Sequence, residues 1–293
     1  MKKLLIIAGA FLALASCAAK PEKKEIGIQL YSVRELIGSK DKFDANHESV
    51  FAKLAEQGYS TVELCWYDGN GFFGLTPEEM TAELAKAGLK PISSHVGNAL
   101  TPEEIESGDF SAKEEWWKKC IADHKAMGCE YLVTAWFKVP DTLAGLKVWC
   151  DYFNWIGALC KEEGLKFGYH NHAHEFKKLE DVVIYDFIAE NTDPALVVLE
   201  MDVYWAVVGK AAPVEYFKKY PGRFELLHIK DVAEVGQSGF VGFDAIFNNA
   251  ELAGMRRYIV EMEKSLVGDI LETTRISADY LKEAPFVKAT YAE

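Results

Sequence analysis

The feature that most constrains the fold is a regular alternation of short β-rich runs with amphipathic segments. Cap residues separate the two kinds of segment: Thr76-Pro77 is typical of a helix start, for example, and Gly88 of a helix end. Such an alternation predicts repeated βα units around a parallel sheet, and eight consecutive units are enough to close a barrel. The eight runs are Ile26–Tyr31, Thr61–Cys65, Lys90–His95, Tyr131–Thr134, Lys166–His170, Leu196–Met201, Glu225–Ile229 and Tyr258–Met262.

Length and charge fit one barrel that acts on a small molecule. A (β/α)8 barrel of the α/β class uses about 250 residues as one domain, so we expect a single TIM-barrel domain over residues 26–293. The 32 basic and 45 acidic side chains give a net charge of −13, and no run of Lys or Arg is longer than two residues. An acidic surface without a basic patch repels phosphate backbones, so we expect no nucleic-acid partner.

The first 17 residues have the composition of an export signal. Two lysines precede a twelve-residue apolar run, Leu4–Ala15, which is too short to span a bilayer as a mature helix. The run leads into Cys17 through a sequence that resembles the bacterial lipobox, so we expect a lipoprotein signal peptide over residues 1–17 with Cys17 lipidated. The polar stretch 18–25 is typical of a tether. We therefore expect an exported bacterial lipoprotein on the periplasmic side of the cell envelope, which touches membrane only through its lipid anchor.

Polar side chains gather where the β-rich runs end. In a parallel barrel the reactive groups lie at the carboxyl ends of the strands. Here these ends carry imidazoles and carboxylates, which are the groups that bind divalent metals or move protons. The sequence therefore predicts a site at this end of the barrel. The residues concerned are Gln29, Tyr31, Glu63, His95, Trp136, His170, His172, Glu200, Asp202, His228, Lys230, Asp231, Glu261 and Glu263.

The densest part of this pattern is His170-Asn171-His172-Ala173-His174. Residues i and i+2 of an extended strand project to the same side, so His170 and His172 can reach one ligand, and we expect His174 to take no part. The alternative is a chance cluster in a solvated loop. Because the chain has only 7 His, three within five residues favour a site over that alternative.

Three further strands end on side chains of the same kind. Asp202 follows a buried apolar run, where a carboxylate needs a partner or a metal unless it caps the next helix. His228 and Lys230 share one face of their strand, and Glu261 ends the last strand. Each of these alone is compatible with a surface position or a salt bridge. Together they supply nitrogen and oxygen ligands from adjacent strands, as an open metal site requires.

Aromatic side chains at the strand ends predict a carbohydrate ligand. Any one of Tyr31, Trp136 and Trp205 could belong to the core, but several at a barrel mouth suit the C–H faces of sugar rings. The loop Gly69–Gly74 matches G-x-G-x-x-G literally. However, the next helix begins separately at Thr76, which disfavours a nucleotide fingerprint and favours a glycine-rich active-site loop.

Five motifs taken together resemble the sugar phosphate isomerase/epimerase family, whose xylose isomerase-like TIM barrel is shared with the family 2 AP endonucleases. The resemblance covers residues 26–284 and depends on the order and spacing of the motifs. The family includes ketose 3-epimerases, hydroxypyruvate isomerases, inosose dehydratases, DNA-repair endonucleases and lyases acting on 3-keto-glycosides, so the resemblance leaves the reaction open. The motifs are Ile28–Arg34, Phe167–His172, Met201–Trp205, Leu227–Asp231 and Ile259–Glu261.

The resemblance implies one divalent metal ion held from the fifth to the eighth strand. Asp202, His228 and Glu261 match the family's ligands by position, and His170 stands where many members have Glu. Two neutral imidazoles and two carboxylates sum to zero with a divalent ion, so the metal should be a stronger Lewis acid than with three carboxylates. Mixed nitrogen and oxygen ligands favour Mn²⁺, Co²⁺, Fe²⁺ or Zn²⁺ over Mg²⁺.

The reaction we expect is that of a divalent-metal-dependent isomerase or epimerase that forms an enediolate from a keto-sugar. In this hypothesis His172 or Glu261 abstracts the proton and Lys230 stabilises the oxyanion. Export favours an unphosphorylated substrate, because phosphosugars are cytoplasmic intermediates. The alternatives are a lyase or dehydratase on 3-keto-glycosides, a metal-dependent hydrolase and a non-catalytic sugar-binding lipoprotein; the oligomeric state stays unknown. The expected substrate-binding residues are Gln29, Tyr31, Glu63, His95, Trp136 and Trp205.

Overall fold

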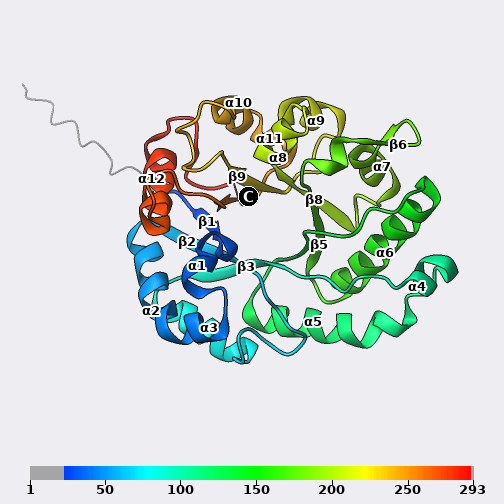
Figure 1. Ribbon diagram of the computed structural model, residues 1–293, viewed down its shortest axis with the longest axis horizontal. Coiled ribbons are helices and arrows are strands. Elements are labelled where there is room, and N and C mark those ends of the chain that lie inside the picture. Colours follow the sequence, from blue (N-terminus) through cyan, green and yellow to red (C-terminus); the bar gives the residue numbers. More distant parts are fainter. Residues whose placement is uncertain (1–22, 292–293) are drawn as a thin grey trace, which may run out of the picture.

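The computed structural model describes residues 23–291, which form a closed barrel of eight parallel strands surrounded by helices (Figure 1). Each barrel strand pairs with the barrel strands before and after it in the chain, and the last pairs with the first. This confirms the predicted (β/α)8 TIM barrel of the α/β class. The strands are β1 (Ile26–Gln29), β2 (Tyr59–Leu64), β3 (Lys90–His95), β4 (Tyr131–Thr134), β5 (Lys166–His170), β8 (Val197–Asp202), β9 (Leu226–Lys230) and β10 (Arg257–Glu261).

Helices cover the outside of the barrel, and a short hairpin of β6 (Lys178–Leu179) and β7 (Val182–Val183) follows β5. The expected helix start at Thr76 is confirmed by a capping box, in which Thr76 Oγ1 accepts from the backbone N–H of Glu79 at 3.2 Å. The helices are α1 (Arg34–Ile37), α2 (Lys40–Glu56), α3 (Pro77–Lys86), α4 (Pro102–Ser107), α5 (Glu114–Met127), α6 (Leu143–Glu162), α7 (Ile184–Asn191), α8 (Val203–Val208), α9 (Pro213–Lys219), α10 (Phe243–Asn248), α11 (Ala250–Ala253) and α12 (Ile270–Glu283), with 3₁₀ turns η1 (Leu30–Val33), η2 (Ser111–Lys113) and η3 (His174–Phe176).

Several strand bounds differ from the sequence prediction by one or two residues, and the differences at the ends of β1 and β8 each position a polar side chain. β1 ends at Gln29 instead of Tyr31, because the Gln29 side chain accepts from the Tyr31 N–H at 3.1 Å and caps η1. β8 extends one residue beyond Met201, to Asp202, whose Oδ1 accepts from the Trp205 N–H at 2.8 Å and caps α8. The caps end the strands while both side chains stay fully buried.

The barrel interior changes from apolar to polar along its length. On β8, Val198 belongs to a small interior cluster, whereas its neighbours Val197 and Leu199 pack in the main core under the helices. Glu200 and Asp202 have the same parity as Val198, so the inward positions become polar towards the carboxyl end. The apolar interior cluster consists of Ile92, Tyr131, Val133, Val198, Leu226 and Ile259.

Residues 1–22 and 292–293 lie outside the described chain, so the predicted signal peptide, lipidated Cys17 and most of the tether have no structural test. The domain boundaries likewise stay predictions. Where the described chain begins, the Lys24 ammonium donates to the backbone carbonyls of Leu281 and Ala284 at 2.9 and 2.6 Å. Within residues 23–291, none of the helices combines the length and hydropathy that crossing a bilayer requires.

Helix α6 approaches the start of β8 so closely that only a glycine fits between them. A Cβ atom on Gly157 would lie 2.4 Å from the backbone carbonyl oxygen of Leu196, well inside contact distance. Leu196 directly precedes β8, so the position of this helix and that of the strand carrying Glu200 and Asp202 are linked.

We predict that Gly157→Ala lowers the free energy of unfolding by about 1–3 kcal/mol, because the backbone contact must open to admit the methyl group. This loss opposes the usual gain in helix propensity on replacing glycine by alanine. Gly97→Ala is the matched control, since a Cβ there meets nothing within 4 Å. Chemical denaturation measures both, and equal stabilities of the two variants would contradict the packing argument.

Candidate metal and active site

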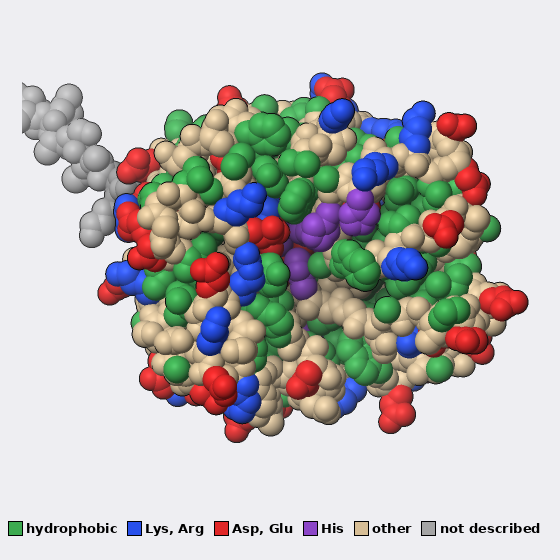
Figure 2. All heavy atoms as spheres, viewed as in Figure 1, with side chains coloured by type: hydrophobic (Ala, Val, Ile, Leu, Met, Phe, Trp, Pro, Cys, Tyr) green, Lys and Arg blue, Asp and Glu red, His purple; other side chains and the backbone are tan. Residues whose placement is uncertain are grey.

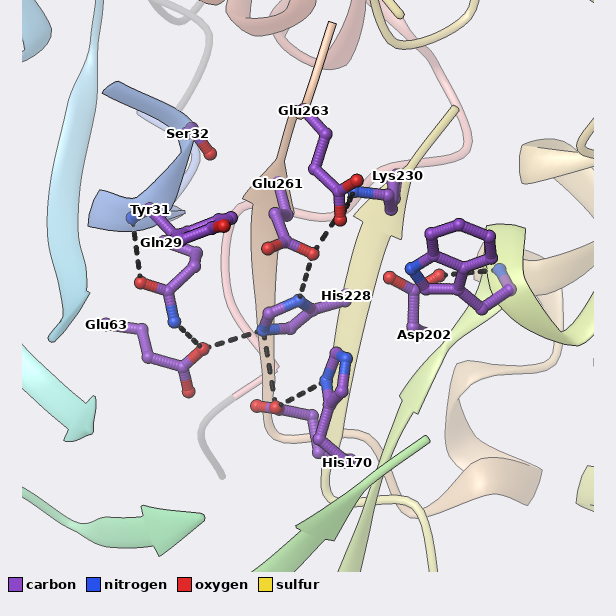
Figure 3. A network of polar contacts seen from close by, with 12 residues as sticks. Gln29, Tyr31, Ser32, Glu63, His170, Asp202, His228, Lys230, Glu261 and Glu263 are labelled. Carbon is purple, nitrogen blue, oxygen red and sulfur yellow. Dashed lines mark hydrogen bonds and ion pairs between the residues drawn. The ribbon is translucent and has the colours of Figure 1, made fainter. Parts of the chain in front are cut away.

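Four side chains from adjacent strands meet at the carboxyl end of the barrel. His170 ends β5, Asp202 ends β8, His228 lies on β9 and Glu261 ends β10. Each offers one ligand atom, and these atoms all lie within 4.8 Å of one another. All four residues are buried. Figure 2 shows histidines gathered in the hollowed centre of this face, and Figure 3 shows the four side chains converging.

Strand register explains why these residues meet. Asp202 is the direct neighbour of His228 in the β8–β9 pairing, and Glu261 is the direct neighbour of Lys230 in the β9–β10 pairing. His228 and Lys230 are two residues apart on β9 and therefore share a face. The inward faces of three consecutive strands thus deliver ligand atoms to one point.

The donor set fits a divalent cation. Asp202 uses Oδ1 to cap α8, while its Oδ2 is buried and has no hydrogen-bond partner among residues 23–291. Burial, the largest influence, and the nearby Glu261 raise the pKa of Asp202 to about 7, which shows how poorly this carboxylate is compensated by protein groups alone. Two imidazole nitrogens and two carboxylates would balance a divalent ion in charge and ligand type.

Two further carboxylates determine which ring nitrogen each histidine presents. His170 Nδ1 lies 3.0 Å from Glu200 Oε2, and His228 Nε2 lies 2.7 Å from Glu63 Oε1. Hydrogen bonds donated to these carboxylates would leave Nε2 of His170 and Nδ1 of His228 to face the ligand set. His228 Nδ1 lies 3.3 Å from Glu261 Oε2. Burial lowers the pKa of His228, but Glu200 and Glu63 outweigh it and hold that pKa well above its usual range, so a cation at Nδ1 would replace a proton.

Glu63 is the more firmly held of the two outer carboxylates. It accepts from Gln29 Nε2 at 2.7 Å and from Ser93 Oγ at 2.6 Å, in addition to His228. Gln29 and Glu63 are both fully buried and lie on the side of His228 away from Asp202 (Figure 3). Their burial favours a supporting role, although substrate binding by these two residues stays a prediction.

His95 connects the two outer carboxylates. Its Nε2 lies 2.9 Å from Glu63 Oε1 and 2.9 Å from Glu200 Oε2. Burial disfavours the charged imidazolium, but the two carboxylates outweigh it and raise the pKa of His95 to about 10. At Glu200, burial and the nearby Glu63 raise the pKa, while His228 and His95 lower it. The raising influences are larger, so the pKa of Glu200 rises to about 7. A positive His95 between two carboxylates reduces the cost of enclosing both of them.

Glu200 is the residue whose role the sequence reasoning missed. It was placed at a strand end but given no function, whereas the structure buries it completely against His170 and His95. The available signal was its spacing, because Glu200 stands two residues before Asp202 and must face the same side of β8.

Lys230 and His172 lie beside the ligand set. Lys230 Nζ is 3.4 Å from Glu261 Oε2 and 2.9 Å from Glu263 Oε1, and only 2% of the residue is exposed. Burial would raise the pKa of Glu261, but Lys230 and His228 outweigh it and hold that pKa well below its usual range. The His172 ring lies 5.1 Å from that of His170, and its Nδ1 has no hydrogen-bond partner in the described chain.

The three aromatic residues expected to contact substrate surround this centre at different exposures. Trp136 is 64% exposed, whereas Tyr31 is 39% exposed and has the Arg34 guanidinium 4.5 Å from its ring centroid. Trp205 is half-buried, and its ring lies 5.9 Å from His172 and 5.7 Å from Lys230 Nζ. Of the three, Trp205 is thus the one that the structure places against the expected catalytic side chains.

Comparison with known proteins assigns the chain to a family. A family model described as a xylose isomerase-like TIM barrel matches residues 51–284, and the chain belongs to this family. Two crystal structures of sugar phosphate isomerase/epimerases from Parabacteroides distasonis ATCC 8503 are similar: one is 36% identical, covers 90% of this chain and 100% of its own, and has a TM-score of 0.81. The other is 32% identical, with coverages of 94% and 98% and a TM-score of 0.82.

The curated relatives that match the chain include inosose dehydratases. An inosose dehydratase from Geobacillus kaustophilus is 26% identical over 201 residues, which cover 63% of this chain and 62% of that protein. One from Clostridium perfringens is 28% identical over 196 residues, covering 54% and 64% respectively. The chain therefore spans somewhat less than two thirds of the length of these relatives. The family membership and the buried His and carboxylate cluster together indicate an enzyme of the sugar isomerase, epimerase and dehydratase type.

We predict that Glu200→Gln weakens Mn²⁺ binding by about 10–100-fold, because the neutral amide holds the His170 ring and its proton less firmly. Calorimetric titration of chelator-treated protein measures the affinity. Glu234→Gln is a suitable control, since Glu234 is also buried but binds the loop backbone at Leu266. An unchanged affinity in Glu200→Gln would remove the outer carboxylate from the argument.

We also predict that Mn²⁺ or Zn²⁺ raises the Tm of chelator-treated protein more than the same concentration of Mg²⁺, since the ligand set includes two imidazoles. Asp202→Asn should abolish the shift. Glu83→Gln should leave it intact, although Glu83 belongs to another, less buried His and Glu group with His47 and Glu48. A shift that survives in Asp202→Asn would place the bound ion elsewhere.

Proposed function

We propose that the protein is a divalent-metal-dependent sugar isomerase or epimerase that removes a proton next to the carbonyl of an unphosphorylated keto-sugar. The observation that carries this proposal is the convergence of His170, Asp202, His228 and Glu261 within 4.8 Å. A divalent ion held by these side chains would supply Lewis acidity to a carbonyl oxygen and so make the adjacent C–H group more acidic.

His172 is the group that we assign to proton transfer. Its Nδ1 has no partner within residues 23–291, whereas Glu261 already faces His228 and Lys230. The His172 backbone N–H donates to Glu175 Oε2 at 2.9 Å, and the Tyr169 hydroxyl donates to Glu175 Oε1 at 2.6 Å. These bonds hold the loop after β5, so the backbone from which the His172 side chain extends is fixed in position.

Lys230 is the group that we assign to the oxyanion. Its ammonium has three protons, and the two carboxylates beside it, Glu261 and Glu263, leave one for a substrate oxygen. Because Lys230 is almost fully buried, its charge acts on the reacting atoms with little screening by water. The ring of Trp205, 5.7 Å away, limits the positions that the ammonium can reach.

Dehydration of a cyclic keto-polyol is the second candidate. It shares the first step, but the reaction then ends with loss of a β-hydroxyl group instead of reprotonation. Two observations favour it: the curated relatives are inosose dehydratases, and His170 departs from the acidic residue that the family resemblance implies at that ligand position. His172, whose Nδ1 has no partner in the described chain, is the single base that we assign, and a dehydration needs only one base to remove the carbon-bound proton.

Two features support an unphosphorylated substrate. Lys230 has one proton left beside its two carboxylates, and we assign that proton to the oxyanion and not to a phosphate group; the chain also carries a net charge of −13, which disfavours anionic substrates. The apolar run before Cys17 supports export as a lipoprotein, and an exported enzyme meets few phosphosugars. A hydrolase or a sugar-binding lipoprotein would use the same barrel without removing a carbon-bound proton.

We predict that the metal-loaded protein exchanges the α-proton of a keto-sugar with deuterium from D₂O, and that Glu261→Gln slows this exchange by roughly 100-fold or more. Mass spectrometry of a keto-sugar and keto-inositol panel measures the exchange. Glu263→Gln is the matched control, because Glu263 also pairs with Lys230 but is not among the four ligands.

The products separate the candidate functions. Exchange with a changed stereocentre or carbonyl position supports the isomerase or epimerase, and exchange with loss of water supports the dehydratase. Ligand binding without exchange would favour the binding protein, whereas hydrolysis without exchange would favour the hydrolase. Wild-type exchange in Glu261→Gln would remove this side chain from the mechanism.

A further inference from the structure

The third histidine of the cluster after β5, His174, has no role in the proposed reaction. It opens the turn η3, and it belongs to none of the groups of residues within 23–291 that could hold a metal ion. Its side chain is 35% exposed, whereas His170 is buried. The cluster therefore contains an imidazole that reaches the solvent as well as one that belongs to the four-ligand set.

The rings of the three histidines contact one another in chain order. The centroids of His170 and His172 are 5.1 Å apart with the ring planes at 70°, and those of His172 and His174 are 5.9 Å apart with the planes at 20°. Histidine side chains are visible at the surface of this face of the barrel (Figure 2). The three rings thus lead from the ligand set, through His172, to an exposed imidazole.

The other ionisable neighbours of His172 are more enclosed. Glu175 is fully buried, and its two oxygens accept from the Tyr169 hydroxyl at 2.6 Å and from the His172 backbone N–H at 2.9 Å. The charges of Glu261 and His95 also act on the His172 ring, but these side chains are only 8% and 15% exposed. Among these neighbours, His174 offers the most open connection to the solvent.

A base that removes a carbon-bound proton must pass this proton on before it can act again. The His172 Nδ1 atom is buried and has no hydrogen-bond partner within the described chain, so bulk water does not take the proton from it directly. An imidazole can accept a proton at one ring nitrogen and release one from the other, and imidazoles titrate near neutral pH. A second imidazole beside His172 is therefore a suitable proton carrier.

The contacts of His174 hold its ring in place without covering it. Its Nε2 lies 3.5 Å from Glu175 Oε1, and its backbone carbonyl accepts from the Lys177 N–H at 3.1 Å, which closes η3. The centroid distance of 5.9 Å between the nearly parallel rings of His172 and His174 is too long for a direct hydrogen bond between ring nitrogens. It suits transfer through one bridging water molecule.

We propose that His174 carries protons between His172 and bulk water. One proton moves from a ring nitrogen of His172 through a water molecule to one nitrogen of His174, and a proton leaves the other nitrogen of His174 for the solvent. The reverse sequence returns a proton to His172, and no other bond is made or broken. This inference rests on the proposed function for the origin of the proton on His172, and His174 acts through His172 and not on the substrate.

The first test measures the keto-sugar exchange of the metal-loaded protein in D₂O at low and at high concentration of imidazole buffer. We expect His174→Gln to slow the exchange by about tenfold or more at low buffer concentration, because His172 loses its proton carrier, and added imidazole to restore it. Lys177→Gln is the matched control, because Lys177 is an exposed residue that ends the same turn. Its exchange should equal that of the wild type at both buffer concentrations.

The second test needs no turnover. NMR of the zinc-loaded protein with ¹⁵N-labelled histidine measures how fast the ring N–H of His172 exchanges with water, and His172→Gln identifies its signal. We expect His174→Gln to slow this exchange by about tenfold and Lys177→Gln to leave it unchanged.

The outcomes separate the relay from the proposed function. Keto-sugar exchange that His174→Gln leaves unchanged at low buffer concentration overturns the relay and leaves the proposed function standing. A loss that imidazole does not restore also overturns the relay, because a structural defect would explain it. If the wild type exchanges no sugar, the proposed function fails; a slower His172 N–H exchange in His174→Gln then still supports the relay, and an unchanged one overturns it.

Discussion

The arrangement of the site depends on two carboxylates, Glu63 and Glu200, that the barrel encloses completely. An isolated buried carboxylate is strongly unfavourable, so each must be paired. Glu63 accepts from Gln29, Ser93 and His228, while Glu200 faces His95 and His170. These bonds fix the orientation of the two rings that belong to the ligand set. The orientation of His170 and His228 is therefore determined by buried groups outside the four-ligand set.

A closed barrel makes this layered interior possible. Every backbone group of its strands can pair within the sheet, so the inward positions are left to side chains alone. The amino-terminal half is filled by a small apolar cluster that includes Val198 and Ile259, and the next inward positions on the same strands are Glu200 and Glu261. Apolar packing therefore stabilises the amino-terminal end of each of these strands, while polar side chains lie at the carboxyl end. Both kinds of side chain point inward, because every second residue of a strand faces the same side.

The sequence predicted the parts of this structure that depend on local pattern. The β-rich runs, the cap at Thr76 and the polar residues near the carboxyl ends of the strands, Asp202, His228 and Glu261, follow from periodicity and residue type, and the barrel is confirmed. The sequence did not predict which polar residues pair with the histidines of the four-ligand set from outside that set. Glu63 meets His228 across 165 residues of chain, and His95 meets Glu200 across 105. Such contacts depend on the stagger of the strands around the barrel, which local spacing does not encode.

His170 and Glu200 are best understood as one unit. They are direct partners in the β5–β8 ladder, with His170 Nδ1 3.0 Å from Glu200 Oε2. An acidic residue at position 170, as the family resemblance implies for many members, would stand beside the Glu200 carboxylate at a site where burial already raises the Glu200 pKa to about 7. Two buried carboxylates without a proton between them would repel each other. The imidazole at 170 is therefore compatible with the carboxylate at 200, which faces His170 on one side and His95 on the other.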